Sequence, residues 1–167
     1  FTGTLFWRYD VNRQARELWA LTDELTGAIV RRRGMELIEV EVARAKRRNE
    51  PLAFALFDLD EFKRINDTLG HQVGDQVLAA VGQILRSSVR PHDQVIRWGG
   101  EEFLVVLPHT ELRQAHECAE RIRVEVGRLV RPTAITVSCG LATLPDDREA
   151  VDAIAEADKM LYEAKRT

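Results

Sequence analysis

Two adjacent glutamates, Glu101 and Glu102, follow a glycine pair in the segment Arg-Trp-Gly-Gly-Glu-Glu-Phe, residues 97–103. Residues 94–98 and 103–107 are each typical of a short strand. A Gly-Gly pair between strands predicts a two-residue hairpin turn, because glycine reaches the positive φ values of primed turns. Successive strand residues point to opposite faces, so the two glutamates are expected to have different roles. An ordinary acidic surface hairpin is the alternative.

A second pair of acids, Asp58 and Asp60, follows the continuous apolar run of residues 52–57. Such a run is typical of a central strand buried on both faces. If this strand neighbours the hairpin, Asp58 and Glu101 converge, and Asp60 and Glu102 can join them. Two carboxylates about 4 Å apart repel by roughly 4 kcal/mol at an effective dielectric constant near 20. The predicted cluster therefore needs protonation or a cation.

Carboxylate oxygens without His or Cys at metal spacing favour Mg²⁺ or Mn²⁺, ions that commonly keep water and substrate phosphate oxygens as further ligands. A glycosidase-like pair of acids is the alternative chemistry. The cationic and amide side chains near these acids suit a nucleotide, and aromatic platforms for a sugar are few. A metal-dependent nucleotide site is thus the favoured interpretation.

Composition indicates an ordinary globular domain of 167 residues, with 45% hydrophobic and 31% charged residues and a net charge of −3. The sequence lacks the bulk positive charge that would indicate a nucleic-acid partner. No apolar run reaches the roughly 18 residues of a membrane span, so no membrane contact is expected. Cys118 and Cys139 lack CxxC spacing and are expected to be buried free thiols in a reducing, cytoplasmic compartment, with a disulfide as the alternative.

Apolar periodicity predicts helices over residues 34–48, 73–89, 111–129 and 150–165, strands over residues 52–57, 94–98, 103–107 and 134–144, and a compact turn over residues 61–70. Because strands and helices alternate, we expect a central mixed sheet flanked by helices.

Residues 1–22 look least like part of a domain. Val11, Ala15, Leu18 and Leu21 lie three or four positions apart and predict a helix with one narrow apolar stripe. This stripe either packs on its own domain or pairs with a second copy, as the end of a linker from an upstream sensory domain. The chain begins with Phe1, which indicates a piece cut from a longer protein.

Several ordered motifs make the chain resemble the GGDEF-domain diguanylate cyclases, in the GGEEF variant. They lie at residues 57–75, 97–103, 136–140 and 157–165, and the resemblance covers residues 23–167 as the catalytic domain. It implies an α/β (α+β) fold with a mainly antiparallel sheet flanked by helices, related to the palm of nucleotide cyclases and polymerases. It also implies that two GTP molecules are joined into cyclic di-GMP with release of two pyrophosphates.

For the catalytic residues, the resemblance implies that Asp58 and Glu101 hold two Mg²⁺ or Mn²⁺ ions, with the backbone carbonyl of Leu59 as a further ligand. A metal pair can lower the pKa of the attacking 3′-hydroxyl and stabilise charge on the α-phosphate and pyrophosphate. Glu102 is the candidate for assisting deprotonation or holding a metal-bound water.

The implied substrate-binding residues are Asn66, Asp75, Lys63, Lys165, Gly99 and Gly100. Asn66 and Asp75 would read the guanine edge, and the two lysines would hold the β- and γ-phosphates. The glycines would let the backbone approach the nucleotide. Two departures from the family pattern are Val30, where an asparagine is usual, and the end of the chain at Thr167, before the usual Gly-Arg-Asn.

One domain holds one GTP, so catalysis is expected to need a homodimer with two sites face to face. Arg90 and Asp93 match the RxxD pattern of the family's inhibitory product site, with five residues between Asp93 and Gly99, and Arg121 falls at its third position. Arg44 falls where a partner domain contributes. Arginine suits this role because its planar fork grips phosphate and guanine. The alternative function is a module that binds GTP or cyclic di-GMP and regulates a partner without turnover; complete motifs favour the enzyme.

Overall fold

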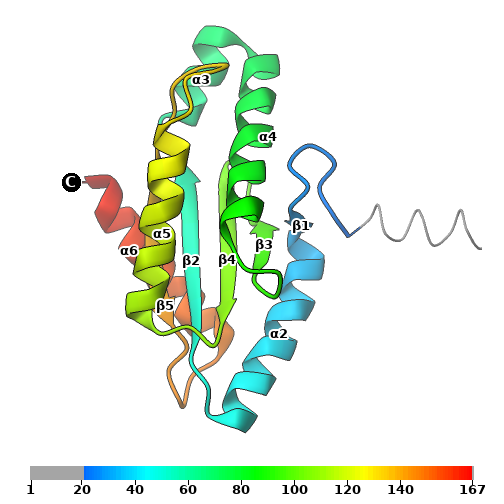
Figure 1. Cartoon of the computed structure of the whole chain (residues 1–167), viewed down its shortest axis with the longest axis vertical. Helices are drawn as coiled ribbons and strands as arrows, with labels where there is room; N and C mark the ends of the chain where they lie inside the picture. Colours follow the sequence, from blue (N-terminus) through cyan, green and yellow to red (C-terminus); the bar gives the residue numbers. More distant parts are fainter. Residues whose placement is uncertain (1–20, 167) are drawn as a thin grey trace, which may run out of the picture.

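The structure, a computed structural model, describes residues 21–166, and its core is one five-stranded sheet in the order β1-β3-β4-β2-β5. The elements are β1 (Ile29–Val30), α2 (Arg31–Arg48), β2 (Leu52–Leu59), α3 (Phe62–Leu69), α4 (His71–Ser88), β3 (Gln94–Arg97), β4 (Glu102–Pro108), α5 (Leu112–Gly127), β5 (Val137–Thr143) and α6 (Ala150–Arg166). Only β1 and β3 pair in parallel; the other three pairings are antiparallel. The predicted mixed, mainly antiparallel sheet flanked by helices is confirmed (Figure 1).

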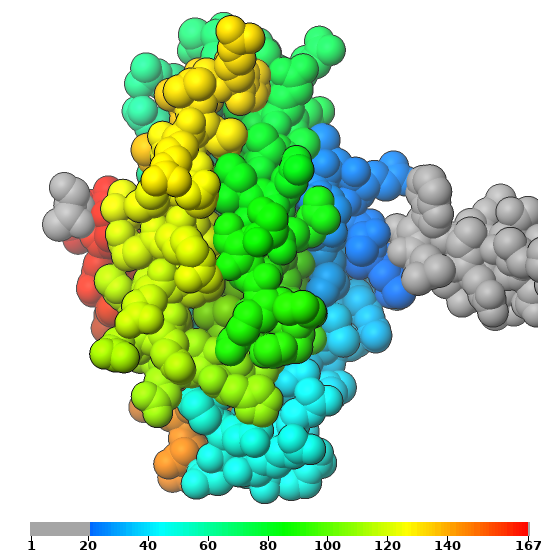
Figure 2. Space-filling model, in the orientation of Figure 1, coloured from blue at the N-terminus to red at the C-terminus, as the bar shows by residue number. Residues whose placement is uncertain are grey.

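Strand β2 runs through the middle of this sheet and is buried on both faces, as predicted. Phe57 and Leu59 pack in a core with residues of α4 and α5, whereas Phe54 and Leu56 pack in a second core with residues of α2 and α6. All four side chains are at most 1% exposed, and full burial of such a side chain contributes roughly 1.5–3 kcal/mol. In Figure 2, α4 and α5 cover the near face of the sheet.

Helix α6 approaches the sheet unusually closely at Gly140 of β5. A Cβ at Gly140 would lie 1.9 Å from the carbonyl oxygen of Ala157. Any side chain at residue 140 would therefore push α6 outward. This close packing lets Lys165, near the end of α6, reach the end of β2.

Residues 61–70, predicted as a compact turn, instead contain the eight-residue helix α3. Its start follows Glu61 in the left-handed region, at φ 51°, and its end is Gly70, at φ 88°. Phe62 is the only residue of α3 that is fully buried. The prediction was wrong because α3 is short: its apolar residues do lie three and four positions apart, but three such residues are too few to distinguish a helix from a turn.

The turn between β3 and β4 also differs from its prediction. Arg97 pairs with Phe103, and the backbone N–H groups of Trp98 and Gly99 both donate to the carbonyl of Glu102, at 2.8 and 3.2 Å. Residues 99–101 therefore form a longer turn with a bulged closure. Among the described glycines, positive φ occurs at Gly27 and Gly70 and at neither glycine of this turn.

The need for glycine at residue 99 is instead one of space, because a Cβ there would lie 2.6 Å from Oε2 of Glu102. A Cβ at Gly100 would meet no heavy atom within 4 Å, so the backbone of Gly100 faces open space.

The remaining predicted elements are found with shifted ends. Strand β5 is shorter than residues 134–144, and the two-residue β1 was not predicted. Most of the proposed N-terminal helix lies outside the described residues. None of the helices in residues 21–166 is long and apolar enough to cross a membrane. Cys118 and Cys139 are free, as expected, but half-buried, and burial raises the pKa of both thiols.

Candidate active site

The acidic corner forms where the end of β2 meets the start of β4. Asp58 and Glu102 are direct cross-strand partners, and directly opposed side chains of an antiparallel pair lie on the same face. Residues of the same parity, such as Phe54 and Leu104, pack toward α2 and α6. The backbone N–H of Leu59 donates to the carbonyl of Glu101 at 3.2 Å, which ties the turn to β2. The predicted neighbourhood of Asp58 and the hairpin is confirmed.

The carboxylates of this corner destabilise one another's charged forms. Burial raises the pKa of Glu101, and the negative charges of Asp58 and Glu102 raise it further. Burial likewise raises the pKa of Glu102, with further increases from Asp58 and from Asp158 on α6. A nearby cation stabilises the ionised form of such a carboxyl group and so lowers its raised pKa.

Lys165 is the cation that faces this corner from α6. Its ammonium forms an ion pair with Asp58, whose side chain is only 14% exposed. Lys165 also counters the upward pKa shifts of Glu101 and Glu102. Lys165 thus acts on all three carboxylates, and the guanidinium of Arg31 also counters the pKa shift of Glu102.

The donor set fits a hard divalent cation, because it offers carboxylate oxygens and the carbonyl of Leu59. Within residues 21–166, no three His, Cys, Asp or Glu side chains are arranged so that they could hold a metal ion by themselves. The predicted ligands are two side chains, Asp58 and Glu101, and one carbonyl. Substrate phosphate oxygens and water would have to complete such a shell, as is common for Mg²⁺.

Asp60 does not join the acidic corner. Its carboxylate accepts hydrogen bonds from the hydroxyls of Thr136 and Ser138, both at 2.7 Å, and its backbone N–H donates to the carbonyl of Thr136 at 2.9 Å. Asp60 therefore fastens the end of β2 to the segment that leads into β5. The expectation that it could converge with Asp58 is wrong.

Two arginines that the sequence did not single out hold the turn between β3 and β4. Arg97 contacts both carboxylate oxygens of Asp23, at 2.9 and 3.0 Å, and donates to the carbonyl of Gly100 at 2.9 Å. Arg31 donates to the carbonyl of Trp98 at 3.2 Å and lies 4.2 Å from the centre of its ring. Arg97 lies in a quoted motif and Arg31 does not, and the contacts of Arg97 with Asp23 and of Arg31 with Trp98 join residues that are distant in sequence.

Asp23 anchors this arrangement from the segment before β1. Burial favours a higher pKa for its carboxyl, but hydrogen bonds from the hydroxyl and N–H of Thr26, followed by Arg97, lower the pKa overall. The ionised carboxylate is therefore the form that the fold stabilises.

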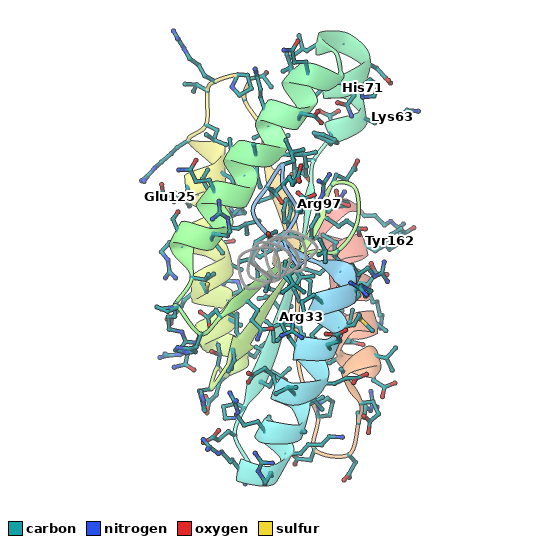
Figure 3. All side chains as sticks on the ribbon, turned by 90° about the vertical axis from the view of Figure 1, so that its right-hand side faces the viewer. Arg33, Lys63, His71, Arg97, Glu125 and Tyr162 are labelled. Atoms are coloured by element: carbon teal, nitrogen blue, oxygen red, sulfur yellow. The ribbon has the colours of Figure 1, made fainter. Side chains whose placement is uncertain are left out.

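The predicted guanine-reading residues lie on the other side of the sheet from α6. Asn66 on α3 is half-buried and Asp75 on α4 is exposed. Lys63 is exposed on α3, and Figure 3 shows it beside His71, at the end of the molecule beyond Arg97. Lys165 instead contacts Asp58, so the two lysines assigned to phosphate lie on opposite layers.

The predicted inhibitory residues gather at the opposite end of β4. Arg90 contacts both oxygens of Asp93 at 3.2 Å, the carbonyl of Pro108 at 3.1 Å and the hydroxyl of Thr110 at 2.6 Å. The Asp93 side chain is only 2% exposed. Arg90 and Asp93 are thus preorganised against each other.

Arg121 reaches the same region from α5, because it donates to the carbonyl of Ser88 at 3.0 Å. Arg44 on α2 pairs with Glu41 at 3.0 Å and lines a small hollow that also includes Pro108. Both arginines lie near the end of β4, on different layers of the sheet.

A cavity of about 370 Å³ lies elsewhere, between α3 and the segment of residues 127–136. It includes Asp60 and Arg64, and it contains none of the residues predicted to bind metal or nucleotide. We therefore place the candidate active site at the acidic corner and not in this cavity.

An α+β domain with carboxylates at the meeting point of its central strand and an acidic hairpin is a nucleotide-cyclase type of domain. The chain belongs to the family "Diguanylate cyclase, GGDEF domain", whose family model matches residues 20–167. This confirms the resemblance inferred from the motifs.

Relatives and solved structures support the same assignment. The diguanylate cyclase DgcP of Pseudomonas aeruginosa is 42% identical over 153 residues, which are 88% of this chain and 23% of that protein. The coiled coil and GGDEF domain of DgcB from Caulobacter crescentus, solved with c-di-GMP, has a TM-score of 0.85 at 30% identity and covers 98% of this chain and 92% of that chain. The active GGEEF domain of a diguanylate cyclase from Vibrio cholerae has a TM-score of 0.72 at 36% identity and covers 76% of this chain and 84% of that chain. The chain spans about a quarter of the length of the Pseudomonas relative.

Proposed function

We propose that this domain is an active diguanylate cyclase that joins two GTP molecules into cyclic di-GMP. In each half-reaction the 3′-oxygen of one GTP forms a bond to the α-phosphorus of the other. The bond from that phosphorus to the bridging oxygen of the β-phosphate breaks, pyrophosphate leaves, and the hydroxyl proton is released. The observation that carries the proposal is the group of Asp58, Glu101 and Glu102, which share one ammonium and two of which have raised pKa values.

The residues of the acidic corner have different roles in this reaction. Asp58, Glu101 and the carbonyl of Leu59 would hold two divalent cations, which we expect to be Mg²⁺, or Mn²⁺ in its place. Such ions stabilise charge on the phosphates and favour ionisation of the attacking hydroxyl. Glu102 faces the same side of the sheet as Asp58, and its raised pKa suits a group that accepts a proton.

Lys165 changes partner in this proposal. When cations bind to Asp58, the ammonium is released from its ion pair and can hold a β- or γ-phosphate oxygen. Lys63 on α3 is assigned to the phosphates from the other layer. Asn66 and Asp75 are assigned to the guanine edge.

Two copies of the domain must meet, since each site holds one nucleotide and each hydroxyl attacks the other. We assign residues 1–22 to a linker from an upstream sensory domain, and residues 23–167 to the catalytic domain. A solved relative described as a coiled coil and GGDEF domain supports this division. The free thiols and the GTP substrate support a cytoplasmic location.

Product feedback is the regulatory part of the proposal. Arg90, Asp93 and Arg121 meet at the end of β4, and Arg44 would be contributed by the other domain of a dimer. The c-di-GMP complex of the Caulobacter relative supports product binding to a domain of this family.

Incubation of the purified, nucleotide-free domain with GTP and Mg²⁺, followed by chromatography, tests the activity directly. We expect cyclic di-GMP and pyrophosphate in a 1:2 ratio, and no product when EDTA replaces Mg²⁺. If GTP remains intact at protein concentrations high enough for dimers to form, the domain is a nucleotide-binding module and not an enzyme.

A further inference from the structure

Gly74 of α4 and Asn66 of α3 lie so close that a side chain at residue 74 has no room. A Cβ at Gly74 would lie 1.9 Å from Oδ1 and 3.0 Å from Cγ of Asn66. Helices α3 and α4 are separated by Gly70 alone, so their facing sides are held together. The Asn66 carboxamide therefore rests directly on the backbone of α4.

In this contact the oxygen of the Asn66 amide is closer to the Cβ position of Gly74 than its nitrogen is. The amide oxygen lies against Gly74, and the NH₂ group is on the other side of Cγ. The group presented outward is thus a hydrogen-bond donor. Asp75, the next residue after Gly74, presents an exposed carboxylate, which is an acceptor.

A donor from Asn66 and a carboxylate from Asp75, binding one base together, would match guanine and not adenine. Guanine carries the acceptor O6 next to its N1–H and its exocyclic amine, whereas adenine carries an amine at the position of O6. An outward NH₂ from Asn66 would donate to O6, and Asp75 would accept from the two N–H groups. A rotated amide would place an acceptor against O6 and lose this match.

We infer that Gly74 is a positioning residue for base recognition, which holds the Asn66 amide with its NH₂ group toward O6 of guanine. The inference rests on the proposed function, since it assumes that Asn66 and Asp75 bind the base.

The contact also makes Gly74→Ala a selective perturbation. The nearest atoms to the new methyl group belong to the flexible Asn66 side chain, and the next is Cζ of Phe62 at 3.3 Å. Asn66 can swing away, so the helices can stay in place. Alanine is also a better helix former than glycine. We expect the melting temperature to be unchanged or higher while base recognition is impaired.

The test is calorimetric titration with 3′-deoxy-GTP and 3′-deoxy-ATP in the presence of Mg²⁺, because neither nucleotide has the attacking hydroxyl. Gly74→Ala should weaken binding of 3′-deoxy-GTP about tenfold, the loss expected for one or two hydrogen bonds. Binding of 3′-deoxy-ATP should not weaken, so the preference for guanine falls. Gly127→Ala is the matched control, since a Cβ at Gly127 meets no heavy atom within 4 Å.

A double-mutant cycle with Asn66→Ala separates this inference from the proposed function. We expect Gly74→Ala to have little further effect once Asn66 is alanine. If Asn66→Ala binds 3′-deoxy-GTP as tightly as the wild type, the assignment of Asn66 to guanine is wrong. If Asn66→Ala weakens binding and Gly74→Ala does not, the positioning role is overturned. It is also overturned if Gly74→Ala weakens both nucleotides equally, or lowers affinity equally in the Asn66→Ala background.

Discussion

Strand β4 begins at Glu102 in the acidic corner and ends at Pro108 beside Arg90, and the two ends balance charge differently. They are about 20 Å apart, given a rise of about 3.4 Å per residue. At the first end the carboxylates outnumber the nearby cationic groups, and the pKa values of Glu101 and Glu102 are raised. At the second end the guanidinium of Arg90 already has a carboxylate, a carbonyl and a hydroxyl as partners.

The difference teaches how each end should respond to a ligand. The acidic corner has more negative charge than its own cation can compensate, so an added cation is stabilised without breaking the fold. The Arg90 corner is satisfied, so a phosphate must compete with Asp93 for the same guanidinium. We therefore expect large functional effects from changes at the first end and smaller ones at the second.

The largest effect should come from Glu101→Gln. This change removes a proposed metal ligand and one of three repelling charges. Turnover should fall about a thousandfold or more, the scale seen when a preorganised electrostatic group is lost. The melting temperature should stay the same or rise, because repulsion with Asp58 is relieved. Chromatography of the product and scanning calorimetry measure the two effects. Wild-type turnover in this variant would mean that the metal site is misplaced.

Arg97→Ala tests whether the acidic corner depends on its distant anchor. The change removes the bonds to Asp23 and to the Gly100 carbonyl, and leaves Asp23 ionised without its guanidinium. We expect a loss of roughly 2 kcal/mol in the free energy of unfolding and a fall in turnover of about tenfold as the turn loosens. Chemical denaturation and steady-state kinetics check both values.

Arg123→Ala is the control for this comparison, because Arg123 pairs with Glu120 on the exposed side of α5. Exposed ion pairs contribute little to stability because water and salt screen them, and no change in turnover is expected. Equal effects of the two substitutions would show that Arg97 has no special role in holding the turn.

The fold and the acidic corner could be predicted largely from the sequence because their signals are local. The run of residues 52–57 shows its double burial directly, and Asp58 at its end and Glu102 of the hairpin lie in two motifs that the sheet brings together. Helix α3 escaped prediction because its eight residues include only three apolar ones, too few to distinguish a short helix from a turn. The anchoring of Arg97 by Asp23 also escaped, since 74 residues separate the two partners.

The glycine pair shows a different limit of prediction from the sequence. A Gly-Gly sequence predicts freedom in φ, yet neither glycine of the turn has a positive φ. What Gly99 provides is space for the Glu102 carboxylate, and that depends on a contact in three dimensions. Gly74 illustrates the same point on α4, where a motif glycine makes room for Asn66.

Metal binding at the acidic corner should depend on pH, which distinguishes this end of β4 from the Arg90 end. Because the pKa values of Glu101 and Glu102 are raised in the fold, the folded protein binds more protons than the unfolded chain from about pH 4.5 up to those raised values. Stability without metal should therefore fall as pH rises through this window. Metal affinity should rise with pH over the same range, by up to about tenfold per pH unit for each proton released.

Calorimetric titration with Mg²⁺ and 3′-deoxy-GTP in buffers of different ionisation enthalpy measures this proton release. Glu102→Gln should reduce the number of protons released, and Glu120→Gln on the exposed face of α5 should not. A proton count that is the same in all three proteins would contradict the electrostatic picture of the acidic corner.

Arg90→Ala should give the smallest effect, and it tests the satisfied end of β4. A hydrogen bond to a charged group contributes roughly 1.5–3 kcal/mol, but Arg90 must give up part of its contact with Asp93 to bind a phosphate. We therefore expect product affinity to fall only about fivefold, which corresponds to about 1 kcal/mol, with initial turnover unchanged and inhibition by accumulated product relieved. Titration with cyclic di-GMP and progress curves measure these effects, and Arg123→Ala serves again as the control. Unchanged product affinity would reject the site. A loss of a hundredfold or more would show that the Asp93 contact does not compete with the ligand, and the contrast between the two ends of β4 would then fail.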